Sequence, residues 1–323
     1  MKLLSRSAPQ GLLTDELQEK LHAWKIKDVV LLQGGSLVWE WHDKGVDRIG
    51  AVYSVTKSIL SALIGIALEQ GLIESIETPI SRYFPQIERA DDERMQAIRI
   101  KHLLTMTSGI EWPEFDKPYW QMKRTDDPVS FVLSQPMEHE PGDAFAYNSG
   151  GSHLLSAILT QVTGMSTYDY ADQKLFKKLA FRRPRWNSDH AGIFEGGVGL
   201  HLTAEDMAKF GQLYLQGGRW EGEQVVPEAW VASSTTAHHK GFSHYEPPIF
   251  GEYGYHWWVS SQAHNRVVDF YFAKGYGGQY IAVVPSLELV AAIRKEPDGK
   301  GSAIYAKLLL LETIVPFCSS SVH

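Results

Sequence analysis

The sequence predicts an α/β fold in which an antiparallel sheet of about five strands, built from both chain ends, is flanked by helices and carries a large, mostly helical inserted lobe. Strand-like runs lie near both ends of the 323 residues, and the stretch between them has mostly helical patterns. No internal repeat, low-complexity tract or linker separates these parts. We therefore expect one interleaved unit over residues 1–323, with 1–75 and 265–323 in the α/β lobe and 76–264 in the helical lobe.

The amino-terminal region contains a helix, a hairpin and a second helix. Residues 14–25 (TDELQEKLHAWK) have a capping threonine, early acids and apolar side chains at helical spacing, which predicts a helix. Residues 28–42 (DVVLLQGGSLVWEWH) contain two strand-like runs around Gly34-Gly35, which predict a β-hairpin. Residues 51–73 (AVYSVTKSILSALIGIALEQGLI) become apolar on nearly all sides, which predicts a helix enclosed by protein.

The rest of the chain supplies the inserted helices and the remaining strands. Residues 203–218 begin with Thr203, have Asp206 three positions on and end at Gly217, a pattern typical of a capped helix. Residues 166–180 are also helical in pattern. The carboxyl end predicts three strands and a last helix, at 267–275, 279–285, 287–295 and 302–315.

Composition excludes several classes of function. The chain has 31 Lys and Arg against 38 Asp and Glu, without long runs of either sign, which argues against a nucleic acid partner. Cys318 is the only cysteine, so an intrachain disulfide and a CxxC metal cluster are excluded. The amino terminus lacks the apolar core of a signal peptide, and the longest apolar stretch, 59–68, is about half of a membrane span. We therefore expect a cytoplasmic protein with no membrane partner.

Ser54 and Lys57 lie at the start of the enclosed helix. Positions i and i+3 of a helix share a face, so the two side chains are expected to be adjacent. Burial lowers the pKa of a lysine, and a neutral lysine can take a proton from a neighbouring hydroxyl. The free N–H groups at the helix start also stabilise developing negative charge. An ordinary solvent-facing lysine remains an alternative on this motif alone.

Two further segments carry polar groups next to glycines. Residues 140–155 (EPGDAFAYNSGGSHLL) place Tyr147, Asn148 and Ser149 on a loop before a helix, although a core tyrosine and a tight turn are the favoured interpretation of this segment alone. Residues 275–278 (GYGG) end a strand, where backbone N–H groups are accessible to a substrate, although a glycine-rich hairpin turn fits as well.

In this order, the three segments resemble the serine β-lactamase and penicillin-binding protein superfamily, whose signatures include Ser-x-x-Lys. The chain is most similar to the class C β-lactamase-like serine hydrolases, in the branch of the esterases and 6-aminohexanoate-dimer hydrolases. Three more segments strengthen the resemblance, namely 103–112 (LLTMTSGIEW), 196–218 (GGVGLHLTAEDMAKFGQLYLQGG) and 253–258 (YGYHWW). The resemblance implies a β-lactamase/transpeptidase-like fold and no metal or organic cofactor.

The resemblance also implies roles for individual residues. Ser54 would be the acylated nucleophile and Lys57 its proton acceptor, while Tyr147 would share the proton and protonate the leaving group. The backbone N–H groups of Ser54 and Tyr276 would form the oxyanion hole. The residues expected to bind substrate are Asn148, Ser149, Gly275, Gly277 and Trp120.

Two motifs depart from the family pattern. The usual Tyr-Ser-Asn or Tyr-Ala-Asn is replaced by Tyr147-Asn148-Ser149, so that a hydroxyl stands where an amide would hold the substrate carbonyl. The usual Lys-Thr-Gly or His-Thr-Gly has two registers here, Ala273-Lys274-Gly275 or Lys274-Gly275-Tyr276. The first directs Lys274 away from the cleft and the second directs it in, because side chains alternate along a strand. The short GYGGQ loop favours the first register.

The sequence thus predicts a serine hydrolase that cleaves a small ester, amide or lactam through an acyl-enzyme. One alternative is a penicillin-binding D-alanyl carboxypeptidase or a true β-lactamase, which would need Lys274 in the cleft. An alternative of another class is a non-catalytic penicillin-recognising sensor or scaffold. The natural substrate and the oligomeric state stay open.

Overall fold

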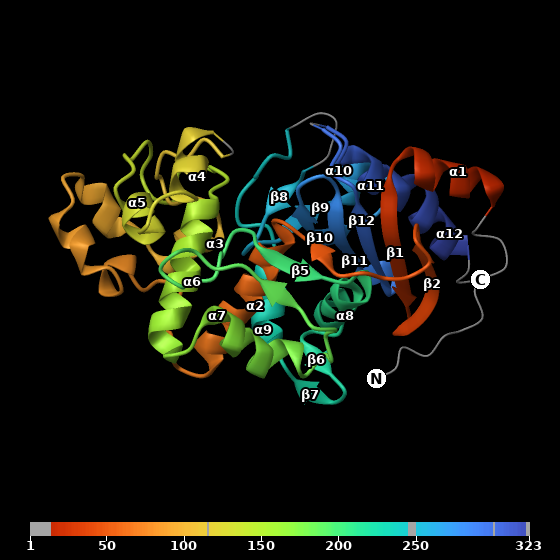
Figure 1. Cartoon of the computed structure of the whole chain (residues 1–323), viewed down its shortest axis with the longest axis horizontal. Helices are drawn as coiled ribbons and strands as arrows, with labels where there is room; N and C mark the ends of the chain where they lie inside the picture. Colours follow the sequence, from red (N-terminus) through yellow and green to blue (C-terminus); the bar gives the residue numbers. More distant parts are fainter. Residues whose placement is uncertain (1–13, 115, 245–249, 300, 321–323) are drawn as a thin grey trace.

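A computed structural model describes residues 14–114, 116–244, 250–299 and 301–320. Within these residues the largest sheet is antiparallel and has seven strands in the order β2-β1-β12-β11-β10-β9-β8 (Figure 1). Five of them are the predicted ones from the two chain ends, namely β1 (Ile26–Gln33), β2 (Ser36–His42), β10 (Phe270–Gly275), β11 (Gln279–Val284) and β12 (Leu289–Lys295). Pairing of β1 with β12 joins the two chain ends, so the predicted fold class is confirmed.

Two short strands extend the sheet beyond the predicted five. They are β8 (Glu252–Tyr253) and β9 (Trp258–Ser260). Strands of two or three residues are too short to show the alternation that identifies a strand in a sequence. Both belong to the stretch that was assigned to the helical lobe. The division at residues 75 and 265 itself stays a prediction.

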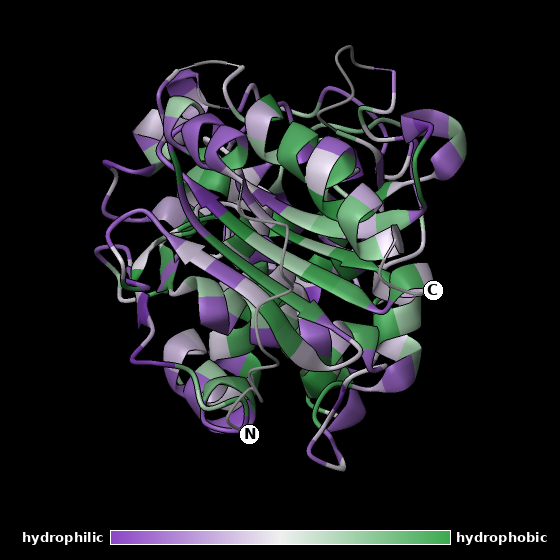
Figure 2. Ribbon diagram, turned by 90° about the vertical axis from the view of Figure 1, so that its right-hand side faces the viewer, coloured by the Kyte–Doolittle hydropathy of each residue, from purple (hydrophilic) through white to green (hydrophobic). Residues whose placement is uncertain are grey.

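Helices cover both faces of the sheet. One face packs against α1 (Asp15–Ala23), α11 (Ile304–Leu308) and α12 (Val315–Ser320), and a π-helical turn joins the last two. The other face packs against α2 (Val55–Glu69) and α8 (Ala204–Leu215). The central strands β11 and β12 are buried along their whole length, and Figure 2 shows their apolar residues between the helix layers. This arrangement makes the sheet and its helices one continuous core.

The inserted lobe packs around α6 (Ser149–Thr163). This helix contacts α2 on one side and the short helices α3 (Ile100–Leu104) and α5 (Pro128–Leu133) on the others. The remaining helices are α4 (Lys117–Met122), α7 (Thr167–Ala171), α9 (Glu228–Ser234) and α10 (Gln262–Asn265). The remaining strands are β3 (Gly50–Ala51), β4 (Arg185–Trp186), β5 (Leu200–Leu202), β6 (Arg219–Trp220) and β7 (Glu223–Gln224). As Figure 1 shows, α2 lies between the lobe and the sheet, so its amino end opens at the boundary of the two.

The predicted helix caps are present. Thr14 accepts a hydrogen bond from the Leu17 N–H at 3.1 Å. Thr203 and Asp206 form a reciprocal capping box at the start of α8, and Gly217 follows the helix with a φ of +61°. No helix of the described residues is long and apolar enough to cross a membrane.

Candidate active site

Ser54 is the residue before the first turn of α2, and its side chain is available for other partners. A serine at this position usually accepts a hydrogen bond from a helix N–H, but Ser54 makes no such bond. The preceding residue, Tyr53, has a φ of +49°, a left-handed conformation that costs roughly 1–2 kcal/mol in a residue with a side chain. The Thr56 hydroxyl donates to the Tyr53 carbonyl at 2.6 Å, which stabilises this turn. The turn presents the Ser54 hydroxyl to a cavity.

Lys57 lies one turn further along α2 and is 1% exposed. Its Nζ lies 3.3 Å from the Ser54 hydroxyl, 2.9 Å from the Ser149 hydroxyl and 2.7 Å from the Gly197 carbonyl oxygen. Burial lowers the pKa of Lys57 to about 8, and the charge of Glu114 opposes this shift. A substantial fraction of this lysine is therefore neutral at mildly alkaline pH. The predicted adjacency of Ser54 and Lys57 is what the structure shows.

Tyr147 is a neighbour of both Ser54 and Lys57. Its ring is stacked on Trp258 with 5.8 Å between centroids, and Lys57 Nζ lies 4.8 Å from the centre of the ring. Burial raises the pKa of Tyr147, and its hydrogen bond with Ser54 opposes this rise. Tyr147 is therefore a neutral phenol in the pH range in which Lys57 titrates, and it can act as a proton donor.

Ser149 is bound to Glu114, a residue that the sequence analysis did not predict. The Ser149 hydroxyl donates to Glu114 Oε1, and the Ser149 N–H donates to Oε2 at 3.0 Å. The Trp112 indole N–H donates to the same Oε2 at 2.7 Å. Because the Ser149 hydroxyl donates its hydrogen to Glu114, it accepts the hydrogen bond from Lys57. No sequence pattern singles out this contact, because Glu114 is one of three acids, with Glu111 and Asp116, in a loop rich in aromatic residues.

Asn148 and Trp120 lie apart from these groups. Asn148 is 2% exposed, and its Oδ1 accepts from the Gly151 N–H at 2.8 Å, so it caps α6. Trp120 is 52% exposed and packs edge-on against Tyr119. Neither is among the described residues that line the cavity at Ser54.

The end of β10 forms the opposite wall. Gly275 lies against the Val52 carbonyl oxygen, at a distance that leaves no room for a Cβ. The ring of the next residue, Tyr276, contacts Tyr53 edge-on with 5.6 Å between centroids. Gly277 then has a φ of +73°, which favours glycine. The backbone of Tyr276 thus lies beside the turn that carries Ser54, as an oxyanion hole would require.

The cavity has a volume of about 590 Å³, and six aromatic residues are among those that line it. It is lined by Ser54, Trp112, Glu114, Ala146, Tyr147, Phe242, Phe250, Trp258, Lys274, Gly275, Tyr276, Gly277, Gly299, Gly301 and Ala303. Ser54, Tyr147 and Tyr276 therefore share one cavity with two of the predicted substrate-binding residues, Gly275 and Gly277. This volume is typical of a small-molecule site.

Lys274 also lines this cavity. The register that the GYGGQ loop favoured would instead have directed its side chain away from the cleft. Its cross-strand partner is Tyr280, on the sheet face opposite α2. The side chain still reaches the cavity because β9 pairs with β10 only as far as Phe272, which leaves the strand edge open beside Lys274. Lys274 Nζ lies 4.5 Å from the centre of the Phe250 ring, and burial lowers its pKa to about 8.

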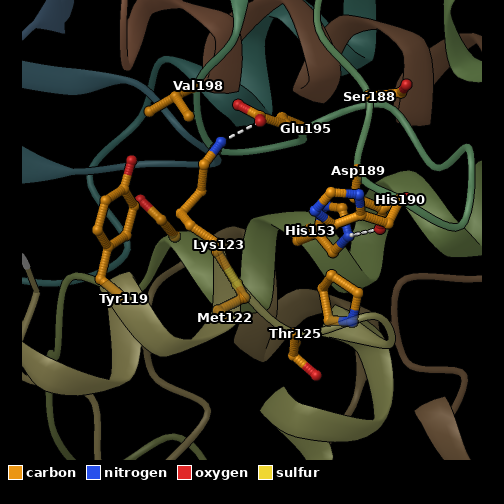
Figure 3. A pocket seen from close by; sticks show the side chains of 13 residues that line it. Tyr119, Met122, Lys123, Thr125, His153, Ser188, Asp189, His190, Glu195 and Val198 are labelled. Atoms are coloured by element: carbon orange, nitrogen blue, oxygen red, sulfur yellow. Dashed lines mark hydrogen bonds and ion pairs between the residues drawn. The ribbon is translucent and has the colours of Figure 1, made fainter.

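A smaller cavity, of about 120 Å³, borders Ser149 and Gly197 as well (Figure 3). Two side-chain pairs line it: Lys123 with Glu195, and His153 with Asp189 at 2.9 Å. Since Ser149 and Gly197 both bind Lys57, this polar cavity lies directly next to the partners of the lysine.

A group of potential metal ligands lies elsewhere, in Asp28, His42 and Asp47. Arg294 Nη1 is 3.6 Å from the Asp28 carboxylate and 3.8 Å from that of Asp47. This guanidinium already balances the two carboxylates, and none of the three residues lines the cavity at Ser54.

Comparison with known proteins agrees with this architecture. Residues 29–301 match the family model described as Beta-lactamase. The 6-aminohexanoate-dimer hydrolase of Paenarthrobacter ureafaciens is 24% identical over 308 residues, which cover 88% of this chain and 76% of that protein. The solved structure of EstCE1, described as a hydrolase with promiscuous acyltransferase activity, has a TM-score of 0.75 at 16% identity and covers 93% of this chain and 98% of its own.

A D-stereospecific amidohydrolase from Streptomyces sp. has a TM-score of 0.70 at 17% identity, with 90% of this chain and 96% of its own chain covered. These two structures show the fold, and the family model covers most of the chain. The chain therefore belongs to the beta-lactamase family of hydrolases.

Proposed function

We propose that the protein is a serine hydrolase that cleaves a small ester or amide through an acyl-enzyme on Ser54. The observation that carries the proposal is the position of the Ser54 hydroxyl, which neighbours both the Lys57 amine and the Tyr147 phenol at the wall of a cavity. The names of the relatives, a dimer hydrolase, an amidohydrolase and a hydrolase with acyltransferase activity, support this substrate class.

The hydrogen bonds of Lys57 support its role as the base. A neutral amine has two N–H groups and one lone pair. The Gly197 carbonyl oxygen can only accept a hydrogen bond. The Ser149 hydroxyl also accepts from Lys57, because it donates its own hydrogen to Glu114 in another hydrogen bond. These two acceptors use both N–H groups, so the lone pair of Nζ is directed at the Ser54 hydroxyl.

The reaction then proceeds in two acyl transfers. The Ser54 oxygen attacks the substrate carbonyl and its proton passes to Lys57, while the N–H groups of Ser54 and Tyr276 stabilise the oxyanion. The bond to the leaving group breaks, and the leaving group takes a proton from Tyr147, which Lys57 reprotonates. Water repeats the sequence on the acyl-enzyme and releases the acid and free Ser54.

A β-lactam is a second candidate substrate, and one observation favours it. The Lys274 side chain lines the cavity, and with a pKa of about 8 it is charged at neutral pH, so it can hold the carboxylate of a β-lactam. Ser149 donates its proton to Glu114, however, so it does not offer the substrate carbonyl the donor that the family's asparagine supplies.

A covalent probe and two substrates test the proposal. The protein and Ser54→Ala are incubated with a fluorophosphonate probe, p-nitrophenyl acetate and a chromogenic cephalosporin. We expect labelling and ester turnover by the intact protein and neither by Ser54→Ala. Equal behaviour of the two proteins would refute a serine hydrolase, and fast cephalosporin turnover would assign the second candidate.

A further inference from the structure

The Glu114 carboxylate is a point at which three donors converge. The Ser149 hydroxyl donates to Oε1, while the Ser149 N–H and the Trp112 indole N–H donate to Oε2. A carboxylate has about four acceptor sites, so three of them are occupied by the protein itself. Although Glu114 lines the cavity, its carboxylate is therefore largely used to hold Ser149 rather than a substrate.

This contact decides the direction of the next hydrogen bond. A carboxylate without a proton can only accept, so the hydrogen of the Ser149 hydroxyl points to Glu114. The lone pairs of that hydroxyl then face Lys57 Nζ at 2.9 Å. Since the Gly197 carbonyl also only accepts, Ser54 is left as the proton donor among the three oxygens that Lys57 contacts.

We propose that Glu114 is a positioning residue, which keeps Ser149 a hydrogen-bond acceptor and thereby directs the lone pair of Lys57 to Ser54. The inference rests on the proposed function, because it explains how the base of that reaction is oriented. Glu114 acts through Ser149 and does not itself exchange a proton with the substrate.

Glutamine at this position would reverse the hydrogen bond. Two N–H donors point at the Oε2 position, so the amide oxygen of Gln would take that place and its NH2 group would face the Ser149 hydroxyl. That hydroxyl would then accept from the amide and turn its own hydrogen to Lys57. A neutral Lys57 can accept this hydrogen and a charged one cannot, so the substitution disfavours the charged form.

The charge of Glu114 acts in the same direction. The titratable groups that face Lys57 come from three elements packed against α2. Tyr147 is neutral because burial raises its pKa, and His256, whose Nδ1 lies 3.1 Å from the Lys57 carbonyl oxygen, is neutral because burial lowers its pKa to about 3. Glu114 is therefore the charged side chain among the described residues that stabilises protonated Lys57.

The pH profile of kcat/KM with p-nitrophenyl acetate tests the inference. In the intact protein, kcat/KM is expected to rise with pH through half its maximum near pH 8, as Lys57 loses its proton. Glu114→Gln is expected to move this midpoint to lower pH by roughly one unit, the low end of the effect of one opposite charge. Glu114→Asp, which retains a carboxylate, is expected to move it less.

Matched variants isolate the role of Ser149. Glu111→Gln removes an exposed acid from the same loop and is expected to leave the midpoint unchanged. In a Ser149→Ala background, Glu114→Gln is expected to produce a smaller shift than in the intact protein, because the hydroxyl that transmits the effect is absent. Ser149→Ala alone is also expected to lower the midpoint, since charged Lys57 loses an acceptor, and this variant serves if Glu114→Gln does not fold.

Three outcomes would overturn the inference: an unchanged midpoint in folded Glu114→Gln, equal shifts in Glu114→Gln and Glu114→Asp, or equal shifts with and without the Ser149 hydroxyl. The Ser54→Ala control distinguishes these three outcomes from a failure of the proposed function. Turnover that survives Ser54→Ala refutes the function itself, whereas an inactive Ser54→Ala with an unmoved midpoint refutes only the role of Glu114.

Discussion

Lys274 lines the cavity at Ser54, while Lys57 is buried next to Ser54 itself, and burial lowers the pKa of each to about 8. Their surroundings differ. Lys57 Nζ contacts three oxygens within 3.3 Å, one of them the Ser54 hydroxyl, while Lys274 Nζ lies 4.5 Å over the ring of Phe250. A lowered pKa thus marks a lysine as buried, and only its hydrogen-bond partners distinguish a base from a residue that lines a pocket.

The largest expected difference between the two lysines is in turnover. Lys57→Met is expected to reduce the turnover of p-nitrophenyl acetate by roughly 10²–10⁴-fold, the contribution of general base catalysis. Lys274→Met is the matched control, because it removes another lysine whose pKa burial lowers to about 8 and which lines the cavity at Ser54. Its turnover of this neutral ester is expected to change little. Circular dichroism checks that both variants are folded. Similar losses in the two variants would remove Lys57 as the base.

Tyr147 sharpens the comparison, because it contacts Ser54 and Lys57 but has a raised pKa. Tyr147→Phe is expected to slow the cleavage of a p-nitroanilide by roughly 10²-fold, since an amine must be protonated as it leaves. Cleavage of p-nitrophenyl acetate should slow much less, because p-nitrophenolate leaves without a proton. Equal losses for the two substrates would contradict a role of Tyr147 as the proton donor.

The pH dependence of the free energy of unfolding should be affected similarly by Lys57 and Lys274, because folding lowers the pKa of both. Both are protonated in the folded and unfolded chain below about pH 8, and between pH 8 and the ordinary value of 10.5 only the unfolded chain keeps the protons. Stability therefore rises with pH in this window, by up to about 3 kcal/mol for each lysine.

Urea unfolding at the two ends of that window measures the rise. Lys57→Met and Lys274→Met are each expected to show a smaller rise than the intact protein, although only the first loses activity. A rise that is unchanged in Lys57→Met would show that its pKa is not lowered by folding.

The smallest expected effect concerns substrate charge. Lys274→Met should raise the KM of an ester with a carboxylate on its acyl group by about fivefold, the value of an ion pair of about 1 kcal/mol. The KM of p-nitrophenyl acetate should stay the same. A common change in both KM values would show that Lys274 shapes the cavity rather than binding an anion.

Most of the fold could be predicted from local sequence patterns. The five long strands and the capped helix α8 were predictable, because periodicity and caps extend over many residues of continuous sequence. Strands β8 and β9, with two and three residues, were not, since tertiary pairing alone defines them.

The candidate site divides in the same way. The contact of Ser54 with Lys57 follows from helical spacing, so one short segment predicted it. The contact of Ser149 with Glu114 joins residues 35 positions apart and depends on how a loop folds over α6. Asn148 differs from its neighbour Tyr147, because Tyr147 lines the cavity while the Asn148 side chain caps α6, a difference that sequence proximity does not show.

Gly275 has a consequence for how such a protein can diversify. The strand touches the Val52 carbonyl only because position 275 lacks a side chain, so the spacing between the proposed oxyanion donors is set by two backbones in contact. The aromatic residues around the rest of the cavity do not take part in that contact. Substitutions among them can therefore change which acyl group fits in the course of evolution, while the distance between the two oxyanion donors stays the same.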